Sequence, residues 1–206
     1  MNGQVFFIDP SRCINCKTCE AACASRDDHH GITMIHFTTT YPSGTANSFA
    51  QVCMHCEDPL CVRVCEPGAI GIADDGTVLG VIQERCTGCK LCVQACPFDV
   101  PLYVESMNIA MKCDMCHDRY QNEEKPKCAA ACPTGALAFT SVAEMEQARR
   151  GIAVHDWVAA GEGIRTKAGL ISRRGDPRFD NTPIDIADAL QGIEGYAYFG
   201  QAEGAL

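Results

Sequence analysis

The stretch CINCKTCEAAC, residues 13 to 23, places four cysteines within eleven residues. The same spacing returns in CTGCKLCVQAC at residues 86 to 96. Two looser groups, CMHCEDPLCVRVC at 53 to 65 and CDMCHDRYQNEEKPKCAAAC at 113 to 132, use the remaining cysteines. All sixteen cysteines of the chain therefore fall into four quartets, which indicates one kind of site repeated four times.

Sixteen grouped thiols are compatible with disulfides, zinc sites or iron–sulfur clusters. Disulfide frameworks are typical of small secreted chains, but MNGQVFFIDPSRC lacks the basic start and apolar stretch of a secretory signal. Structural zinc sites usually draw on two separated CxxC pairs, often with histidine. Here three cysteines crowd into one short loop and a fourth follows, as in the CxxCxxCxxxC run of bacterial ferredoxins. The spacing indicates iron–sulfur clusters, with zinc as the remaining alternative.

Each short loop is expected to lead into a helix. The residues after the third cysteine, CEAACAS and CVQAC, look helical, which would place Cys19 and Cys23 one turn apart on the same face. Pro97 and Pro133 directly follow the fourth cysteines of their quartets, where a proline ends a helix. One helix can then reach two clusters, in line with ferredoxins whose fourth cysteine ligates the other cluster of a pair.

The spacer lengths predict which quartets are partners. Between Cys65 and Cys86, two β-rich runs around an Asp-Gly turn predict a hairpin, so the second and third quartets would form a compact unit. The first quartet would then pair with the fourth, and CPTGAL after the fourth does echo CEPGAI after the second. The expected ligand sets are Cys13, Cys16, Cys19 and Cys132; Cys113, Cys116, Cys128 and Cys23; Cys53, Cys56, Cys61 and Cys96; and Cys86, Cys89, Cys92 and Cys65.

These pairings predict an α+β fold of two interleaved ferredoxin-like units. Residues 1–52 together with 97–140 would form the outer unit, and residues 53–96 the inner one. Residues 141–206 contain no cysteine and begin with a short helix candidate, VAEMEQARRG. We expect this last region to be an extended C-terminal arm that contacts a partner.

Three longer segments carry a resemblance to a known family: FFIDPSRCINCKTCEAAC (6–23), HCEDPLCVRVC (55–65) and KCDMCHDRYQNEEKPKCAAACPTGAL (112–137). Through them the chain, from residue 4 to about 140, resembles the four-cluster electron-transfer subunit of the dimethyl sulfoxide reductase type of molybdoenzyme. Relatives occur in polysulfide, thiosulfate, arsenate and nitrite reductases and in formate dehydrogenases. In that family the first quartet pairs with the fourth, in agreement with the spacer argument. Because Cys92 is present where some relatives lack a cysteine, the resemblance implies four 4Fe-4S clusters.

The resemblance implies electron transfer without catalysis. The chain would relay electrons between a catalytic molybdenum- or tungsten-pterin subunit and a redox partner, either a membrane-anchor quinone-reactive subunit or a soluble protein. The alternative is a free polyferredoxin, or a relay for a tungsten aldehyde oxidoreductase, hydrogenase or formate dehydrogenase complex. No serine–histidine–acid set, phosphate loop or dinucleotide fingerprint appears in the sequence, so no catalytic residue is expected.

Charge and hydropathy exclude other classes of partner. A formal net charge of −9 argues against binding nucleic acid or anionic lipid. The longest uncharged apolar-leaning run, CAAACPTGALAFTSVA, is shorter than the roughly 20 residues that a membrane-spanning helix requires. We expect no membrane span and a location in the cytoplasm or at the cytoplasmic membrane face. The alternative is a periplasmic location, reached by export together with a twin-arginine partner.

Several residues near the quartets have two interpretations each. His55 and His117 either tune a cluster by hydrogen bonding or are solvated loop residues. DDHHG at 27 to 31 is either a metal site or a polar loop. Lys17 and Lys90, between the second and third cysteines of their loops, either raise a cluster potential or lie in solvent.

The tail, residues 151 to 206, holds 9 of the chain's 18 glycines together with several aromatic residues. This composition is too irregular for a third domain and too aromatic for a disordered linker. An arm that lays aromatic side chains across a partner fits both facts, and the alternative is that the tail packs on the ferredoxin body. The aromatic residues in question are Trp157, Phe179, Tyr196, Tyr198 and Phe199.

Overall fold

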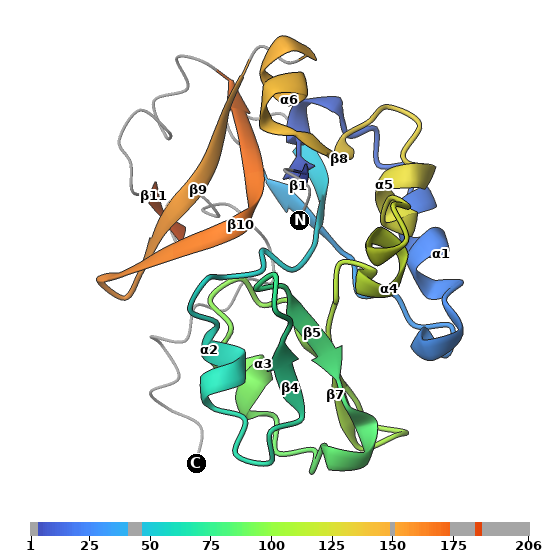
Figure 1. The fold of residues 1–206 in the computed structure, drawn as a ribbon, viewed down its shortest axis with the longest axis vertical. Coiled ribbons are helices and arrows are strands. Elements are labelled where there is room, and N and C mark those ends of the chain that lie inside the picture. The colour runs from blue at the N-terminus through green and yellow to red at the C-terminus, as the bar shows by residue number, and fades with distance from the viewer. Residues whose placement is uncertain (1–3, 41–46, 149–150, 174–183, 187–206) are drawn as a thin grey trace.

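The computed structural model describes residues 4–40, 47–148, 151–173 and 184–186. It has a mixed fold of short helices and small sheets (Figure 1). No helix in the described part of the chain is long and apolar enough to cross a membrane. The helices are α1 (Thr18–Ala24), α2 (Leu60–Arg63), α3 (Leu91–Ala95), α4 (His117–Gln121), α5 (Lys127–Ala131) and α6 (Val142–Ala148), with 3-10 turns η1 (Pro10–Arg12), η2 (Asp27–His29) and η4 (Gln83–Arg85).

The described strands form one five-stranded sheet and three two-stranded hairpins. The sheet has the order β11-β9-β10-β1-β8, and the hairpins are β2-β3, β4-β5 and β6-β7. The strands are β1 (Gln4–Ile8), β2 (His36–Thr40), β3 (Asn47–Gln51), β4 (Ile70–Ile72), β5 (Val78–Val81), β6 (Leu102–Val104), β7 (Ile109–Met111), β8 (Leu137–Ser141), β9 (Gly151–Ala159), β10 (Glu162–Arg173) and β11 (Ile184–Asp185).

The predicted short helices after the cysteine loops are confirmed. Cys19 and Cys23 both lie on α1 and both are buried. α3 ends at Ala95, just before Cys96 and Pro97, and α5 likewise ends two residues before Pro133. These helices are too short to be stable on their own, so their stability has to come from packing around the quartets.

The inner part of the molecule contains the predicted hairpin. β4 and β5 pair antiparallel around a turn that includes Gly76, whose φ of 77° lies in the left-handed region that suits glycine. Figure 1 shows α2, α3, β4, β5 and β7 grouped at one end of the molecule. β7 packs beside β5, so residues 109–111 lie against this hairpin.

The outer part joins the N-terminal strand to the segment after the fourth quartet. β1 pairs antiparallel with β8 over its whole length, from Gln4 with Ser141 to Ile8 with Leu137. α1 packs against α5, and Figure 1 shows both beside α4 on one flank of the molecule. The first and fourth quartets, about a hundred residues apart in sequence, are thereby held next to each other.

The C-terminal region differs from the expected extended arm. β9 and β10 form an antiparallel hairpin, and β10 also pairs in parallel with β1, so residues 151–173 belong to the central sheet. Trp157 of β9 is 3% exposed and packs edge-on against Phe98, with ring centroids 5.6 Å apart. The arm prediction is wrong for this segment, because its buried side chains complete the core of the chain's own body. The other aromatic residues of that prediction, Phe179, Tyr196, Tyr198 and Phe199, lie outside the described residues.

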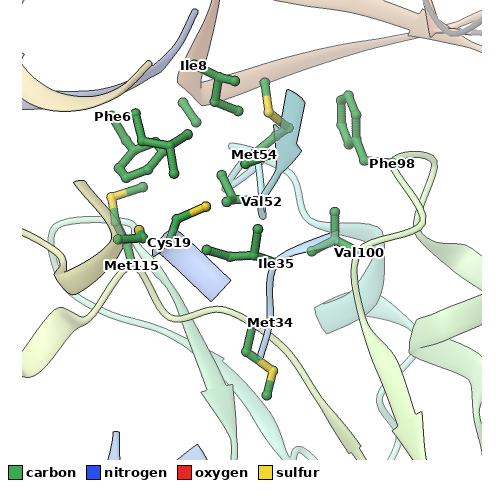
Figure 2. Close-up of a cluster of buried hydrophobic side chains, with 14 of the residues drawn as sticks. Phe6, Ile8, Cys19, Met34, Ile35, Val52, Met54, Phe98, Val100 and Met115 are labelled. Carbon is green, nitrogen blue, oxygen red and sulfur yellow. The ribbon is translucent and has the colours of Figure 1, made fainter. Parts of the chain in front are cut away.

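The largest cluster of buried side chains is continuous with the cysteine quartets. Figure 2 shows Ile35 and Val52 in the middle of this cluster, with Cys19 on one side and Val100 and Phe98 on the other. Every one of these residues is buried. The thiols therefore face apolar walls, which exclude water from much of the space between the quartets.

Candidate metal centres

The structure gathers the sixteen cysteines around four hollows. Three of the hollows are lined by four cysteines each and one by five, and the space inside each hollow, which is open to solvent, is about 320 to 400 Å³. Hollow A is lined by Cys13, Cys16, Cys19 and Cys132, hollow B by Cys23, Cys113, Cys116 and Cys128 together with Cys53, hollow C by Cys53, Cys56, Cys61 and Cys96, and hollow D by Cys65, Cys86, Cys89 and Cys92. Apart from Cys53 at hollow B, the cysteines at each hollow are those of one ligand set that the sequence predicts.

The hollows follow one another in a row, A–B–C–D. α1 carries Cys19 at hollow A and Cys23 at hollow B, so these two hollows are one helical turn apart. Cys53 lines both hollow B and hollow C. α3 contributes Cys92 to hollow D, and Cys96 at its end lines hollow C. Hollows A and D are therefore the two ends of the row.

One backbone feature recurs in all four quartets. The residue before the second cysteine has a positive φ in each loop, between 48° and 72°. This left-handed residue reverses the chain so that backbone N–H groups face the inside of the loop, an arrangement that binds anions. The residues are Asn15, His55, Gly88 and Met115.

Backbone N–H groups also donate to cysteine sulfur atoms from outside the loops. The Sγ of Cys23 accepts from the Met34 N–H at 3.3 Å, and the Sγ of Cys65 from the Ala69 N–H at 3.2 Å. In the same way, the Sγ of Cys132 accepts from the backbone N–H five residues later, at 3.4 Å. Such bonds stabilise thiolate charge, as a cluster with negatively charged ligands needs.

The exposure of the cysteines separates the ends of the row from its middle. Of the sixteen, all within the described residues, only Cys16 in hollow A and Cys89 in hollow D are exposed. The Thr18 hydroxyl donates to the Cys16 thiol and lowers its pKa. In the middle hollows, burial raises the pKa of Cys96 to about 12 and that of Cys113 well above its usual range. Thiols with such raised pKa values stay protonated unless a metal replaces the proton.

The hollows do not have the geometry of zinc sites. Among the described residues, no three Cys, His, Asp or Glu side chains converge closely enough to hold a single metal ion. Four thiolates on one zinc ion would lie only about 3.8 Å apart, given a Zn–S distance of about 2.3 Å. The more open arrangement of four thiols around each hollow fits a 4Fe-4S cluster, which cysteines bind from its four corners.

Comparison with known proteins gives the same result. A family model described as a 4Fe-4S dicluster domain matches residues 45–142, and one described as a 4Fe-4S binding domain matches residues 10–26. The B subunit of the anaerobic dimethyl sulfoxide reductase of Escherichia coli (strain K12) is 39% identical over 155 residues, which cover 69% of this chain and 75% of the relative. The thiosulfate reductase electron transfer subunit PhsB of Salmonella typhi is 34% identical over 182 residues, covering 83% of this chain and 91% of the relative. The chain belongs to this family of iron–sulfur electron-transfer subunits.

A third relative extends the range of the family. The iron–sulfur subunit of the nitrate-inducible formate dehydrogenase of Escherichia coli (strain K12) is 32% identical over 159 residues, 67% of this chain and 54% of the relative. Like these proteins, the chain is an iron–sulfur subunit that carries 4Fe-4S clusters.

A buried cation supports hollow B of this iron–sulfur subunit. The Arg26 side chain is 8% exposed and donates two hydrogen bonds to the Asp28 carboxylate, both at 2.9 Å. It also reaches Asp118 at 2.7 Å and Asp114 at 3.3 Å, so it ties the segment after α1 to the fourth quartet. Burial raises the pKa of the Cys116 thiol, and the Arg26 guanidinium offsets part of this rise because it favours the thiolate.

Two further buried polar side chains face the middle hollows. Lys112 is 4% exposed, lines hollow C, and donates to the carbonyl oxygens of Val78, Leu79 and Cys113 at 2.6 to 3.0 Å. His55 is fully buried and lines hollow B. Burial, followed by the charge of Lys112, lowers the pKa of His55 well below its usual value, so its ring is neutral at pH 7.

The remaining residues with two interpretations are placed as follows. His117 packs edge-on against Tyr120 and lies 4.0 Å from Asp75, outside the four hollows. The Lys17 ammonium lies 5.7 Å from the centre of the Phe37 ring, and that of Lys90 lies 4.1 Å from the Tyr103 ring. Both lysines are exposed, as the solvent interpretation expects, and each also lies over an aromatic face at an end hollow.

In the polar segment 27 to 31, one histidine lies at a hollow and the other is exposed. His29 is buried at hollow B, where its Nδ1 lies 2.8 Å from the carbonyl oxygen of Cys23. His30 is exposed, and Asp28 bonds to Arg26. The sequence did not single out Arg26 or Lys112, because an isolated basic residue gives no signal of burial. Two of the four left-handed positions, Asn15 and Gly88, can be recognised in the sequence, because asparagine and glycine adopt this conformation most readily.

Proposed function

We propose that this chain relays electrons through four 4Fe-4S clusters, one in each hollow, and has no reaction of its own. The single observation that supports this most is the row of four hollows, each lined by the four cysteines of one predicted ligand set. The proposed ligand sets are the four predicted from the sequence, with Cys53 assigned to hollow C. When bound, the clusters supply one-electron redox centres whose potentials depend on hydrogen bonds, charge and exposure.

The chain's own residues give the ends and the middle of the row different tasks. At hollows A and D the exposed Cys16 and Cys89 bring the site to the surface, where a partner can exchange electrons. At hollows B and C apolar walls and buried thiols exclude water and keep electrons inside the protein. Electrons that enter at one end would pass in order through B and C, or C and B, and leave at the other.

The proposed partners are a catalytic molybdenum- or tungsten-pterin subunit at one end and a membrane-anchor or soluble redox protein at the other. The relatives are named as subunits of reductases and of a dehydrogenase, which supports a role in such a complex. We place the complex in the cytoplasm or at the cytoplasmic membrane face. Cys23 of the first quartet is assigned to hollow B, and Cys132 of the fourth quartet to hollow A. This exchange would link hollows A and B into the outer unit. Cys65 and Cys96 would link hollows C and D into the inner unit in the same way.

The ligand assignment is tested by two variants on one helix. Cys19→Ser and Cys23→Ser alter neighbouring ligands on α1, yet they belong to hollows A and B. In anaerobically purified protein with about sixteen iron per chain, each variant should change a different electron paramagnetic resonance signal. Identical spectral losses in both variants would contradict the assignment.

The partner is tested by purifying the native protein under gentle conditions and measuring metals. Molybdenum or tungsten in a fixed ratio to the chain is the expected result. A chain that is isolated alone, with a full iron content and no second subunit, would instead indicate a free polyferredoxin.

A further inference from the structure

His55 belongs to one cluster loop but faces the neighbouring hollow. It lies between Cys53 and Cys56, which both line hollow C, whereas His55 is a lining residue of hollow B and not of hollow C. The side chain is fully buried, and within the described part of the chain neither Nδ1 nor Nε2 has a hydrogen-bond partner. A neutral imidazole has one N–H donor and one acceptor nitrogen, so a donor is left without an acceptor inside the protein.

The backbone that carries this ring is fixed by contacts with β10. The Lys167 N–H donates to the His55 carbonyl oxygen at 3.0 Å, and the Ala168 N–H donates to that of Met54, also at 3.0 Å. On the other side, the Glu57 N–H donates to the Arg165 carbonyl oxygen at 2.9 Å. The loop is therefore paired with the C-terminal hairpin on both sides of His55. The fully buried ring therefore sits on a loop that is held in place on both sides.

The backbone does not by itself require a histidine at this position. The equivalent left-handed residue is Asn15 in the first quartet, Gly88 in the third and Met115 in the fourth. Met115 even lines the same hollow as His55, with an apolar side chain and a φ of 61°. An apolar side chain is thus compatible with both the backbone and the hollow, and histidine adds only a polar group.

His29 provides a contrast within the same hollow. It lines hollow B too, but its Nδ1 already lies 2.8 Å from the Cys23 carbonyl oxygen. A buried donor without an acceptor is destabilising, so His55 needs a partner that the described part of the chain does not supply. A cluster held in hollow B would supply sulfur atoms as acceptors.

Building on the proposed function, we propose that His55 is a positioning residue that donates an N–H hydrogen bond to a sulfur atom of the cluster in hollow B. A donor to cluster sulfur offsets negative charge, which favours the reduced form and raises the reduction potential. Since Cys53 lines both middle hollows, the bond would affect electron transfer between the clusters in hollows B and C. In that step one electron leaves one cluster and reduces its neighbour.

The test is an anaerobic redox titration of His55→Met in the full chain, followed by electron paramagnetic resonance with iron analysis. Methionine is chosen because Met115 shows that it suits this backbone and hollow. We expect full iron content and a lower potential for the cluster whose signal Cys116→Ser alters. The reduction equilibrium should change at least tenfold, which is 59 mV for one electron. His30→Met is the matched control, because His30 also has a left-handed φ, of 52°, but is exposed and lines no hollow.

The outcomes separate this inference from the proposed function. If the wild-type protein has no cluster in hollow B, the proposed function fails. If it has one and His55→Met holds full iron with all four potentials unchanged, only the role of His55 is refuted. Should His55→Met lose iron, His55→Gln decides, since its side chain retains N–H donors. Full iron with a near wild-type potential in His55→Gln supports the hydrogen bond, and full iron with a lowered potential refutes it.

Discussion

The hollows at the ends of the row and those in its middle use the same four thiols but differ in what surrounds them. Hollows A and D are built mainly by CxxCxxC loops, and each presents one exposed cysteine, Cys16 or Cys89. At hollows B and C no cysteine is exposed, and Arg26, His55 and Lys112 are buried nearby. The ligands decide what is bound, whereas the surroundings decide how accessible and how easily reduced each cluster is.

The middle hollows also depend on more distant parts of the chain. Phe98 lines hollow C and packs against Trp157, which comes from the C-terminal hairpin. Hollow D instead rests on segments closer in sequence and on local turns, such as that of the left-handed Gly88, whereas hollow A also includes Cys132 and Leu137 from the fourth quartet and β8. A local change should therefore damage hollow D, and changes far away in sequence should damage the middle.

The largest expected effect is the loss of one end cluster in Gly88→Ala. The added Cβ would lie 2.6 Å from the Asn108 carbonyl oxygen and would also have to adopt a φ of 72°. We expect hollow D to lose its cluster, seen as about four iron fewer per chain. Gly31→Ala is the control, because Gly31 has a φ of 79° but no atom within 4 Å of the added Cβ. Equal iron content in the two variants would show that the close approach at Gly88 does not matter.

The second prediction concerns the support that the C-terminal hairpin gives to the middle hollows. Trp157→Ala removes a side chain that is 3% exposed and should lower the free energy of unfolding by about 3–5 kcal/mol. Anaerobic thermal unfolding measures this, with Ile152→Ala as the control on the same strand. Ile152 is 52% exposed, so its substitution should change stability by less than about 0.5 kcal/mol. A Trp157→Ala protein of unchanged stability that dissociates from its partner would restore the arm interpretation.

The sequence predicts the sites better than their surroundings. Sequence patterns that are local predicted the short helices and the hairpin between the second and third quartets. The four ligand sets stay a prediction, and they coincide with the cysteines that line the hollows except for Cys53 at hollow B. The hairpin at 151–173 was missed because its strands are irregular, with a register shift between Arg165 and Leu170, and its partner β1 is far away in sequence. The burial of Arg26 and Lys112 was missed for the same reason, since it depends on contacts between distant segments.

A third prediction compares a buried ion pair at a middle hollow with an exposed one. Arg26→Met removes the bonds to Asp28, Asp114 and Asp118. It should lower stability by about 1–3 kcal/mol, because hydrogen bonds to a buried charge are lost. Arg63→Met is the control: Arg63 and Asp58 are both exposed, so their pair should contribute less than about 1 kcal/mol. Thermal unfolding of the two variants side by side decides, and an Arg63→Met effect as large as that of Arg26→Met would contradict the prediction.

The smallest expected effect is a gain in stability, and it tests the β9–β10 hairpin without changing any residue that lines a hollow. The β9–β10 turn has Ala160 at φ 50° and Gly161 at φ 82°, the conformation of a type I′ turn, in which Asn-Gly is the preferred pair. Ala160→Asn creates that pair and should stabilise the protein by about 0.5–1 kcal/mol, because asparagine tolerates the left-handed region better than alanine. The corresponding rise in Tm is about 1–4 °C, and iron content and cluster potentials should not change.

Gly161→Ala, with open space around the added Cβ, should lower Tm at the same turn because it places an alanine at a φ of 82°. Opposite shifts in the two variants are expected if this hairpin is part of the folded body. If neither variant changes Tm, the hairpin does not contribute to global stability, and the dependence of the middle hollows on the C-terminal region would have to be abandoned.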